Sequence, residues 1–245
     1  MSRADSAAPV IQAASAYYRD AGHFGWRFAR SKFTLDPVFS AILACDLLAG
    51  RGRILDLGCG QGLLAAWLLA AHSCHANERQ SAWPNGWPPP PRLASYSGIE
   101  INAREVARAR RAFALDPGAA VQIVHGDIRD VDYAAADAVV ILDVLHYLDY
   151  AAQQRVLQRA RGALPAHGVL LLRVGDAAGG VRFALSKTVD HTVALVRRRR
   201  WVPLACRALA DWQALLTRCG FGARHPVPLR RGAAYVNVLL RAEVA

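Results

Sequence analysis

The sequence is short of lysine, of acidic residues and of long apolar runs. It holds 30 basic residues against 19 acidic ones, for a net charge of +11, but only Lys32 and Lys187 are lysines. Because the excess is arginine in an alanine-rich chain, it indicates biased composition as much as selection for a polyanionic partner. Nucleic acid is therefore disfavoured as a partner on charge alone.

Nothing in the sequence is long and apolar enough for a membrane span. The longest apolar run, GLLAAWLLAA at residues 62–71, is about half the length that crosses a bilayer. The start of the chain carries Asp5 and no continuous apolar core, so we predict no secretory signal and expect a cytoplasmic protein. The five cysteines form no paired framework, which favours free thiols in a reducing compartment.

Short apolar segments alternate with helix-like ones along most of the chain. The segments run continuously apolar rather than alternating with polar residues, as in strands that helices cover on both faces. We therefore predict an α/β fold: a doubly wound, mostly parallel seven-stranded sheet with helices on both faces and an antiparallel last strand. Predicted strands are Arg53–Gly58, Tyr96–Ile101, Val121–His125, Asp137–Asp143, Val169–Val174, one in GFGARHPVPL and one in AYVNVLLRAEV.

Two domains are predicted. Residues 1–48 form an N-terminal helical segment that covers the ligand cleft, and residues 49–245 form the ligand-binding domain. A proline-rich stretch at 72–95 reads as a surface insertion, because its proline run excludes regular structure. Residues 177–205 are predicted to hold a basic lid helix.

The stretch ILDLGCGQG at residues 54–62 is the strongest local motif. Its glycines, Gly58, Gly60 and Gly62, have the spacing G-x-G-x-G, and Leu63 occupies the place of the third glycine of a dinucleotide fingerprint. Asp56 precedes the first glycine by two residues, and a carboxylate there suits a cationic ligand group better than a pyrophosphate. The turn follows the first predicted strand, where ligands bind in open parallel sheets.

Two further acids close the next two predicted strands. Glu100 ends YSGIE and is placed to accept hydrogen bonds from ribose hydroxyls, and Asp127 follows the third strand and is placed to accept from an adenine amine. Each alone is also explained as a solvated strand end or a helix cap. Three such features in order on consecutive strands favour a nucleoside ligand.

These motifs, ILDLGCGQG, GIE, GDI and DAVVILDVLHYL, resemble in their order those of class I S-adenosylmethionine-dependent methyltransferases. The resemblance implies S-adenosylmethionine as cofactor, with the glycines and Asp143 at its methionine end, Glu100 on the ribose and Asp127 with Ile128 on the adenine. Cys59 is interpreted as a small filler rather than a nucleophile. The predicted cofactor-binding residues are Asp56, Gly58, Cys59, Gly60, Gly62, Glu100, Ile101, Asp127, Ile128 and Asp143.

A second resemblance extends over almost the whole chain. The stretches RFARSKFTLDPVF, DVLHYLDY and LLLRVGDAAGGVRFALS are similar to the methyltransferase of bacterial aryl polyene (xanthomonadin-like) pigment clusters. This resemblance implies that the methyl acceptor is an aromatic or polyene-related small molecule. The acceptor is expected either free or attached to an acyl carrier protein.

His146 is the candidate base, since it follows the fourth strand and an imidazole titrates near neutral pH; a packed histidine at a strand-to-helix corner is the alternative. Candidate substrate-binding residues are Tyr18, Arg30, Lys32, Tyr147 and Arg173. No metal is expected. Asp143 and Asp176 match the acids that catechol-type methyltransferases use for magnesium, but Ala177 replaces the usual asparagine.

The segment Val181–Trp201 carries apolar residues at near-helical spacing before four arginines. One interpretation is a helix packed on the sheet, with a solvated basic end. The other is a lid over the site or a peripheral contact with a membrane surface. Two alternatives to small-molecule methylation remain: an RNA methyltransferase, and a non-catalytic protein that keeps the cofactor pocket.

Overall fold

The computed structural model describes residues 7–76, 83–114, 116, 118, 120–177, 204–227, 229 and 237–245. The chain divides into two compact units, Met1–Val139 and Val140–Ala245. The predicted boundary after residue 48 falls inside the first unit, and the predicted basic segment Val181–Trp201 lies outside the described residues.

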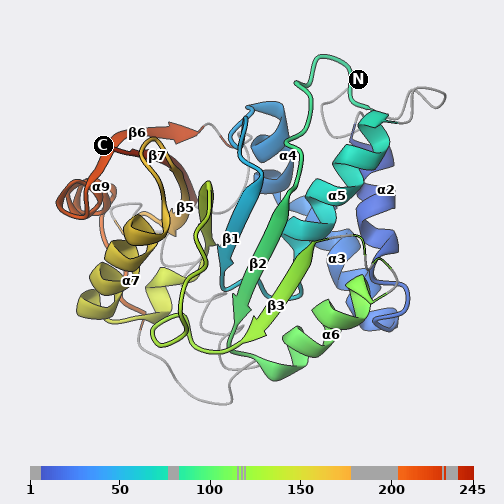
Figure 1. The fold of residues 1–245 in the computed structure, drawn as a ribbon, viewed down its shortest axis with the longest axis horizontal. Coiled ribbons are helices and arrows are strands. Elements are labelled where there is room, and N and C mark those ends of the chain that lie inside the picture. The colour runs from blue at the N-terminus through green and yellow to red at the C-terminus, as the bar shows by residue number, and fades with distance from the viewer. Residues whose placement is uncertain are drawn as a thin grey trace. The chain divides into compact units, whose positions relative to one another are not determined.

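Seven strands form one sheet in the order β3-β2-β1-β4-β5-β7-β6. β1 pairs in parallel with β2, and β2 with β3, as Figure 1 shows, whereas β7 runs antiparallel to both β5 and β6. The predicted fold class, including the antiparallel last strand, is confirmed. The strand bounds are β1 Arg53–Leu57, β2 Ser95–Glu100, β3 Val121–His125, β4 Ala138–Leu142, β5 Val169–Gly175, β6 Phe221–Val227 and β7 Asn237–Val244.

The central strands are buried because their sequences are apolar on both faces. The last four residues of β1, the first four of β4 and the first six of β5 are all buried. Such strands gain stability from both faces, at about 25 cal/mol per Å² of apolar surface removed from water. The continuous apolar runs in the sequence are the signal that located them.

Five described helices belong to the first unit. α2 packs against α5 and α3, and α6 packs against β3 and β2. Side-chain caps set two of the starts: Asp36 accepts from the backbone of Val38 at α4, and Asn102 accepts from that of Arg104 at α6. The bounds are α2 Ala8–Ala16, α3 His23–Leu35, α4 Pro37–Ala44, α5 Leu63–Ala76 and α6 Ala103–Phe113.

Two helices of this unit have bounds that the sequence did not predict. α3 occupies His23–Leu35, inside residues 1–48, which were predicted to be a helical segment. α5 continues to Ala76, so residues 72–76 of the predicted insertion are helical. From Trp83 the chain has no helix or strand until β2, and Trp83 packs edge-on against His75 and Trp87.

The second unit holds the 3-10 helix η2 (Leu145–Tyr147), α7 (Tyr150–Ala163) and α9 (Leu209–Arg218). Gln153 of α7 is fully buried, and its amide nitrogen lies 3.1 Å from the carbonyl oxygens of Leu145 and Leu148 and 2.7 Å from that of Ala205. Its amide oxygen accepts from Nε of Arg207 at 2.7 Å. This one side chain therefore joins the loop after β4 to the segment that leads into α9.

None of the helices among the described residues combines the length and the hydropathy of a transmembrane span.

Replacing Gln153 by leucine is expected to lower the free energy of unfolding by about 3 kcal/mol or more, because buried carbonyls and an arginine N–H lose their partner. Urea unfolding measures the change. Gln154→Leu is the matched control: the same residue type one position on, partly exposed, with an expected change within about 0.5 kcal/mol. Equal effects of the two substitutions would contradict the role given to Gln153.

Candidate active site

The glycine motif forms a tight turn directly after β1. Gly58, Gly60 and Gly62 have φ angles of 79°, 56° and 74°, in the left-handed region that favours glycine. The backbone N–H groups of Gly58 and Cys59 both donate to the carbonyl of Ile99, at 2.8 and 3.1 Å. The turn is thus bound to the end of β2 as well as to its own strand.

The space around these glycines differs from one to the next. A Cβ on Gly62 would lie 2.9 Å from the ring of Phe113, so this glycine permits close packing of α6. A Cβ on Gly60 would have no heavy atom within 4 Å. Gly60 therefore presents bare backbone to open space, as a turn that receives a ligand must.

Cys59 packs inward, over β2. A Cβ on Gly98 would lie 2.6 Å from the sulfur of Cys59, so that glycine makes room for the thiol. Burial, with the nearby carboxyls of Asp56 and Glu100, raises the pKa of the Cys59 thiol well above its usual value. A thiol kept protonated in this way fits the interpretation of Cys59 as a filler.

Glu100 closes β2 with both carboxylate oxygens engaged. One oxygen accepts from the N–H of Gly60 at 3.0 Å, and the other accepts from the N–H of Asn102 at 2.7 Å. Each oxygen keeps a further lone pair, because a carboxylate offers about four acceptor sites. The predicted ribose acceptor therefore lies against the glycine turn, and the neighbouring Ile101 is 42% exposed.

Asp127 and Ile128 lie in the turn after β3. The carboxylate of Asp127 accepts from the backbone and the guanidinium of Arg129, with Nη2 at 2.6 Å. Ile128 is buried, and its carbonyl accepts from the hydroxyl of Tyr133 at 2.6 Å. The structure thus gives Asp127 a local partner, and its role toward adenine stays a prediction.

Asp56 lies buried in β1, where the hydroxyl of Tyr96 donates to it. Burial raises the pKa of Asp56 to about 7; the bond from Tyr96 opposes this rise, and the charge of Glu100 adds to it. Asp56 therefore carries a proton for part of the time at neutral pH. No motif in the sequence pointed to Tyr96, which reaches Asp56 only through the pairing of β1 with β2.

The N-terminal helices contact the same turn. The hydroxyl of Tyr18, a fully buried residue, donates to the carbonyl of Gln61 at 2.9 Å. A Cβ on Gly25 of α3 would lie 3.6 Å from the amide oxygen of Gln61. Tyr18 was predicted to bind substrate, and its hydroxyl is instead hydrogen-bonded to the glycine turn.

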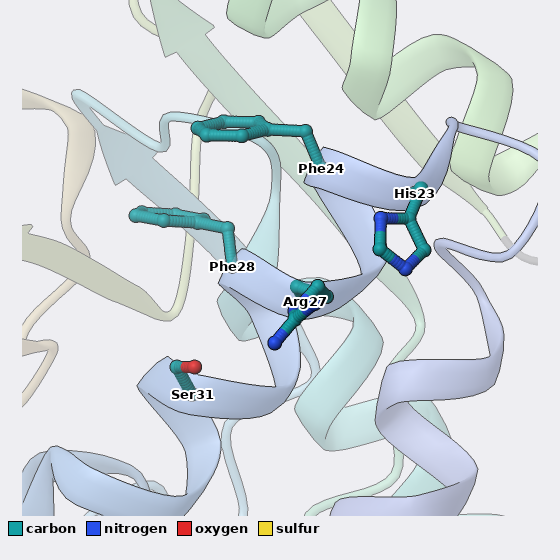
Figure 2. Close-up of a pocket in the computed structure, with 5 residues that line it drawn as sticks. All are labelled: His23, Phe24, Arg27, Phe28 and Ser31. Atoms are coloured by element: carbon teal, nitrogen blue, oxygen red, sulfur yellow. The ribbon is translucent and has the colours of Figure 1, made fainter.

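The two cations of α3 that were predicted to bind substrate, Arg30 and Lys32, have partners close by in the sequence. Lys32 pairs with Asp36 at 3.5 Å, and the guanidinium of Arg30 lies 5.7 Å from the ring centre of Trp26. Other residues of α3 line an open cavity, as Figure 2 shows: His23, Phe24, Arg27, Phe28 and Ser31. Four of them are exposed, and Phe28 is half-buried. In the sequence, this group could have been found from two phenylalanines four residues apart, Phe24 and Phe28, with Arg27 between them.

In the second unit, Asp143 follows β4 with a φ of 59°, unusual for a residue with a side chain. Its carboxylate accepts two hydrogen bonds from the guanidinium of Arg173 and one from Nδ2 of Asn237 at 3.1 Å. Arg173 is itself buried. The structure therefore gives Arg173, a candidate for binding a substrate carboxylate, a carboxylate partner within the protein.

His146 is 6% exposed, and its ring centre lies 4.2 Å from that of Tyr147. This burial agrees with the alternative of a packed corner residue, and the base role stays a prediction. Asp176 accepts from the backbone N–H of Leu209 at the start of α9. Within the described ranges no group of three or more potential ligands is placed to hold a metal.

Replacing Asp56 by asparagine is expected to change how stability depends on pH. An aspartate has a pKa near 4 in the unfolded chain, so the stability due to a protonated Asp56 is full below about pH 4 and is lost as pH rises through about 7. Asparagine still accepts from Tyr96 but does not titrate. Relative to Asp56→Asn, the wild type should therefore lose up to about 1.4 kcal/mol per pH unit in that window.

Urea unfolding of both proteins across this range measures the difference. Asp130→Asn, at an exposed position, is the control for exchanging a carboxyl for an amide. A difference for Asp56→Asn that does not vary with pH would contradict the raised pKa of Asp56.

Known proteins share this architecture and part of the sequence. Residues 55–170 match the family model described as a methyltransferase domain. Carboxy-S-adenosyl-L-methionine synthase of Chromohalobacter salexigens is 36% identical over 84 residues, which is 34% of this chain and 31% of that protein.

Solved structures are similar over most of this chain. An O-methyltransferase family protein from Burkholderia thailandensis has a TM-score of 0.61 and 20% identity, covering 93% of this chain and 62% of that one. The O-methyltransferase of neocarzinostatin biosynthesis, solved with S-adenosylmethionine and 2-hydroxy-5-methyl naphthoic acid, has a TM-score of 0.57 and 22% identity, covering 89% and 56%.

The chain thus spans less than two thirds of the length of each of these three proteins, and the two structures establish the shared fold. The matched segment contains the glycine turn, Glu100 and Asp127, in the order that the sequence predicted. Residues 55–170, just under half of the chain, match a methyltransferase domain, and the strand order is that of the Rossmann-like fold shared with the methyltransferase structures.

Proposed function

We propose that this chain transfers the methyl group of S-adenosylmethionine to a small molecule, an aromatic or polyene-related biosynthetic intermediate. The observation that carries the proposal is the bond between the N–H of Gly60 and the carboxylate of Glu100, at 3.0 Å. It supports the proposal because it holds Glu100, the proposed ribose acceptor, against a turn whose central glycine borders open space.

The residues present fit the cofactor. The carboxylate of Glu100 would hold the ribose hydroxyls with its remaining lone pairs, and the bare backbone at Gly60 would lie against the methionine portion. Asp56 and Glu100 are acids on neighbouring strands, which suits a ligand that carries a positive charge. Ile128 supplies buried apolar surface for the adenine.

When bound, S-adenosylmethionine supplies a methyl group on a sulfonium, which is already a strong electrophile. The work left to this chain is to bind and orient the acceptor and to exclude water, which together contribute several kcal/mol in well-ordered sites. An acceptor hydroxyl would also need to lose its proton, the role proposed for His146.

The acceptor class rests on the motifs in RFARSKFTLDPVF and DVLHYLDY, which resemble the pigment-cluster methyltransferase, and on the similar structures. The neocarzinostatin enzyme was solved with a naphthoic acid, and another similar structure is human N-acetylserotonin methyltransferase. Both proteins are thus associated with an aromatic small molecule by name. We extend that class to this chain, as a free molecule or on an acyl carrier protein.

The alternatives make different predictions. An RNA methyltransferase would bind RNA tightly with a steep loss of affinity in salt; against it, DVLHY follows β4 in place of the Asn/Asp-Pro-Pro-aromatic tetrapeptide of amino-directed enzymes. A non-catalytic protein would bind S-adenosylmethionine without turnover. Mass spectrometry of the acceptor separates methyl from carboxymethyl transfer, a distinction prompted by the match to carboxy-S-adenosyl-L-methionine synthase.

Glu100→Gln is expected to weaken S-adenosylmethionine binding about tenfold or more, because charge-assisted hydrogen bonds to the ribose lose their charge. Titration calorimetry measures the affinity. Glu243→Gln, the same change on β7, is the control and should bind as the wild type does. A wild type that shows no binding at high micromolar concentration would contradict the proposed function.

His146→Ala is expected to lower turnover about a hundredfold while cofactor affinity is unchanged, if an imidazole base takes the acceptor proton. The rate should also lose its dependence on pH near neutrality. Because His146 is buried, thermal unfolding of the variant is measured alongside. An unchanged rate in a folded variant would rule out the base role.

A further inference from the structure

One face of α3 carries an open cavity of about 370 Å³ in the first unit. Its lining residues all come from this helix: His23, Phe24, Arg27, Phe28 and Ser31. The cavity is nearer to an open surface than to an enclosed pocket, so a ligand there would be held against one helix face. Figure 2 shows the two phenylalanine rings one above the other along the helix.

The two rings form an aromatic surface that solvent reaches. Phe24 is 63% exposed, and its ring centre lies 6.2 Å from that of Phe28 with the planes 11° apart. The guanidinium of Arg108, from α6, lies 4.8 Å from the ring centre of Phe24. Phe28 is half-buried beside the exposed Phe24, and a near-parallel pair of this kind offers stacking surface to a flat ring.

The charge at this surface is positive. Arg27 lies between the two phenylalanines in sequence, and no ion pair is recorded for it among the described residues, whereas Lys32 on the same helix pairs with Asp36. None of the five lining residues is acidic. A guanidinium binds a carboxylate through two parallel hydrogen bonds, so this arrangement favours an anion on the ring.

The same helix lies against the glycine turn. Gly25, Ala29 and Phe33 form its buried stripe, and a Cβ on Gly25 would lie 3.6 Å from the amide oxygen of Gln61. Phe24 and Phe28 each directly precede a member of that stripe. Because adjacent residues on a helix are about 100° apart, the aromatic surface lies on the flank of the same helix that packs on the turn proposed to receive the cofactor.

We propose that this face of α3 is the acceptor subsite and that it takes a planar aromatic carboxylate. The ring stacks on Phe24 and Phe28, and the carboxylate binds Arg27. The proposal rests on the proposed methyl transfer, since it places the acceptor beside the glycine turn. It also moves the anchoring charge from Arg30 and Lys32 to Arg27.

The probes are naphthoate and its neutral amide, titrated by calorimetry into the full-length chain. Wild type should bind naphthoate more tightly than the amide. The double variant Phe24→Ala/Phe28→Ala should weaken binding of both probes about tenfold, because it removes the stacking surface. Arg27→Gln should weaken naphthoate alone, about tenfold, to the level of the amide.

Two exposed positions outside the cavity serve as controls. Leu35→Ala, at 79% exposure on the same helix, matches the phenylalanine changes, and Arg104→Gln on α6 matches the arginine change. Neither should alter binding of either probe. Affinity for S-adenosylmethionine, measured separately, should be the same in every variant.

The proposal is overturned if wild type does not bind naphthoate, or if the α3 variants bind both probes as the controls do. It is also overturned if sedimentation shows a dimer that Phe24→Ala/Phe28→Ala dissociates, since a second copy would then be the occupant. Intact S-adenosylmethionine binding in those cases leaves the proposed function standing. If the wild type does not bind S-adenosylmethionine, the proposed function is rejected, whether or not naphthoate binds.

Discussion

The candidate site depends on the carboxylate of Glu100, which joins the end of β2 to the glycine turn. One of its oxygens accepts from Gly60 and the other from Asn102, which also caps α6. The turn meets β2 a second time through the carbonyl of Ile99. Because the carboxylate that shapes the turn is also the proposed ribose acceptor, folding of this corner would prepare the proposed cofactor site in advance.

A buried polar layer supports the turn from beneath. Asp56 and Tyr96 share a hydrogen bond, and Tyr18 donates to the backbone of Gln61. The amide of Gln61 is itself buried, and neither its nitrogen nor its oxygen has a hydrogen-bond partner within the described chain. Burying an amide without hydrogen bonds lowers the stability of the folded protein. Its presence in the glycine turn is therefore consistent with a residue kept for function rather than for stability. In the second unit, buried polar contacts also fix the segments around His146. These are the pairing of Arg173 with Asp143 and the four contacts of Gln153.

The parts predicted well from sequence are those that depend on local pattern. The parallel strands were apparent as continuous apolar runs, and the glycine turn with Glu100 was apparent from spacing at strand ends. The bounds of α3 within the predicted helical segment 1–48 were not apparent, because its buried stripe, Gly25, Ala29 and Phe33, is too small and mixed to give an apolar period. α9 was left unassigned although Trp212, Leu215 and Leu216 have helical spacing. Contacts such as that of Arg173 with Asp143 join residues thirty positions apart, and they follow from strand pairing that one sequence does not display.

The glycine turn, Glu100 and the aromatic surface of α3 all belong to one compact unit, Met1–Val139. The positive φ angles of the glycines, the hydrogen bonds of Glu100 and the packing of α3 on the turn are features of the same corner of the fold. The most direct test is a crystal structure of the protein with S-adenosylhomocysteine, the product form of the cofactor. The account predicts both ribose hydroxyls within hydrogen-bond distance of Glu100, above Gly60. A ribose bound elsewhere, with Glu100 contacting only Gly60 and Asn102, would contradict it.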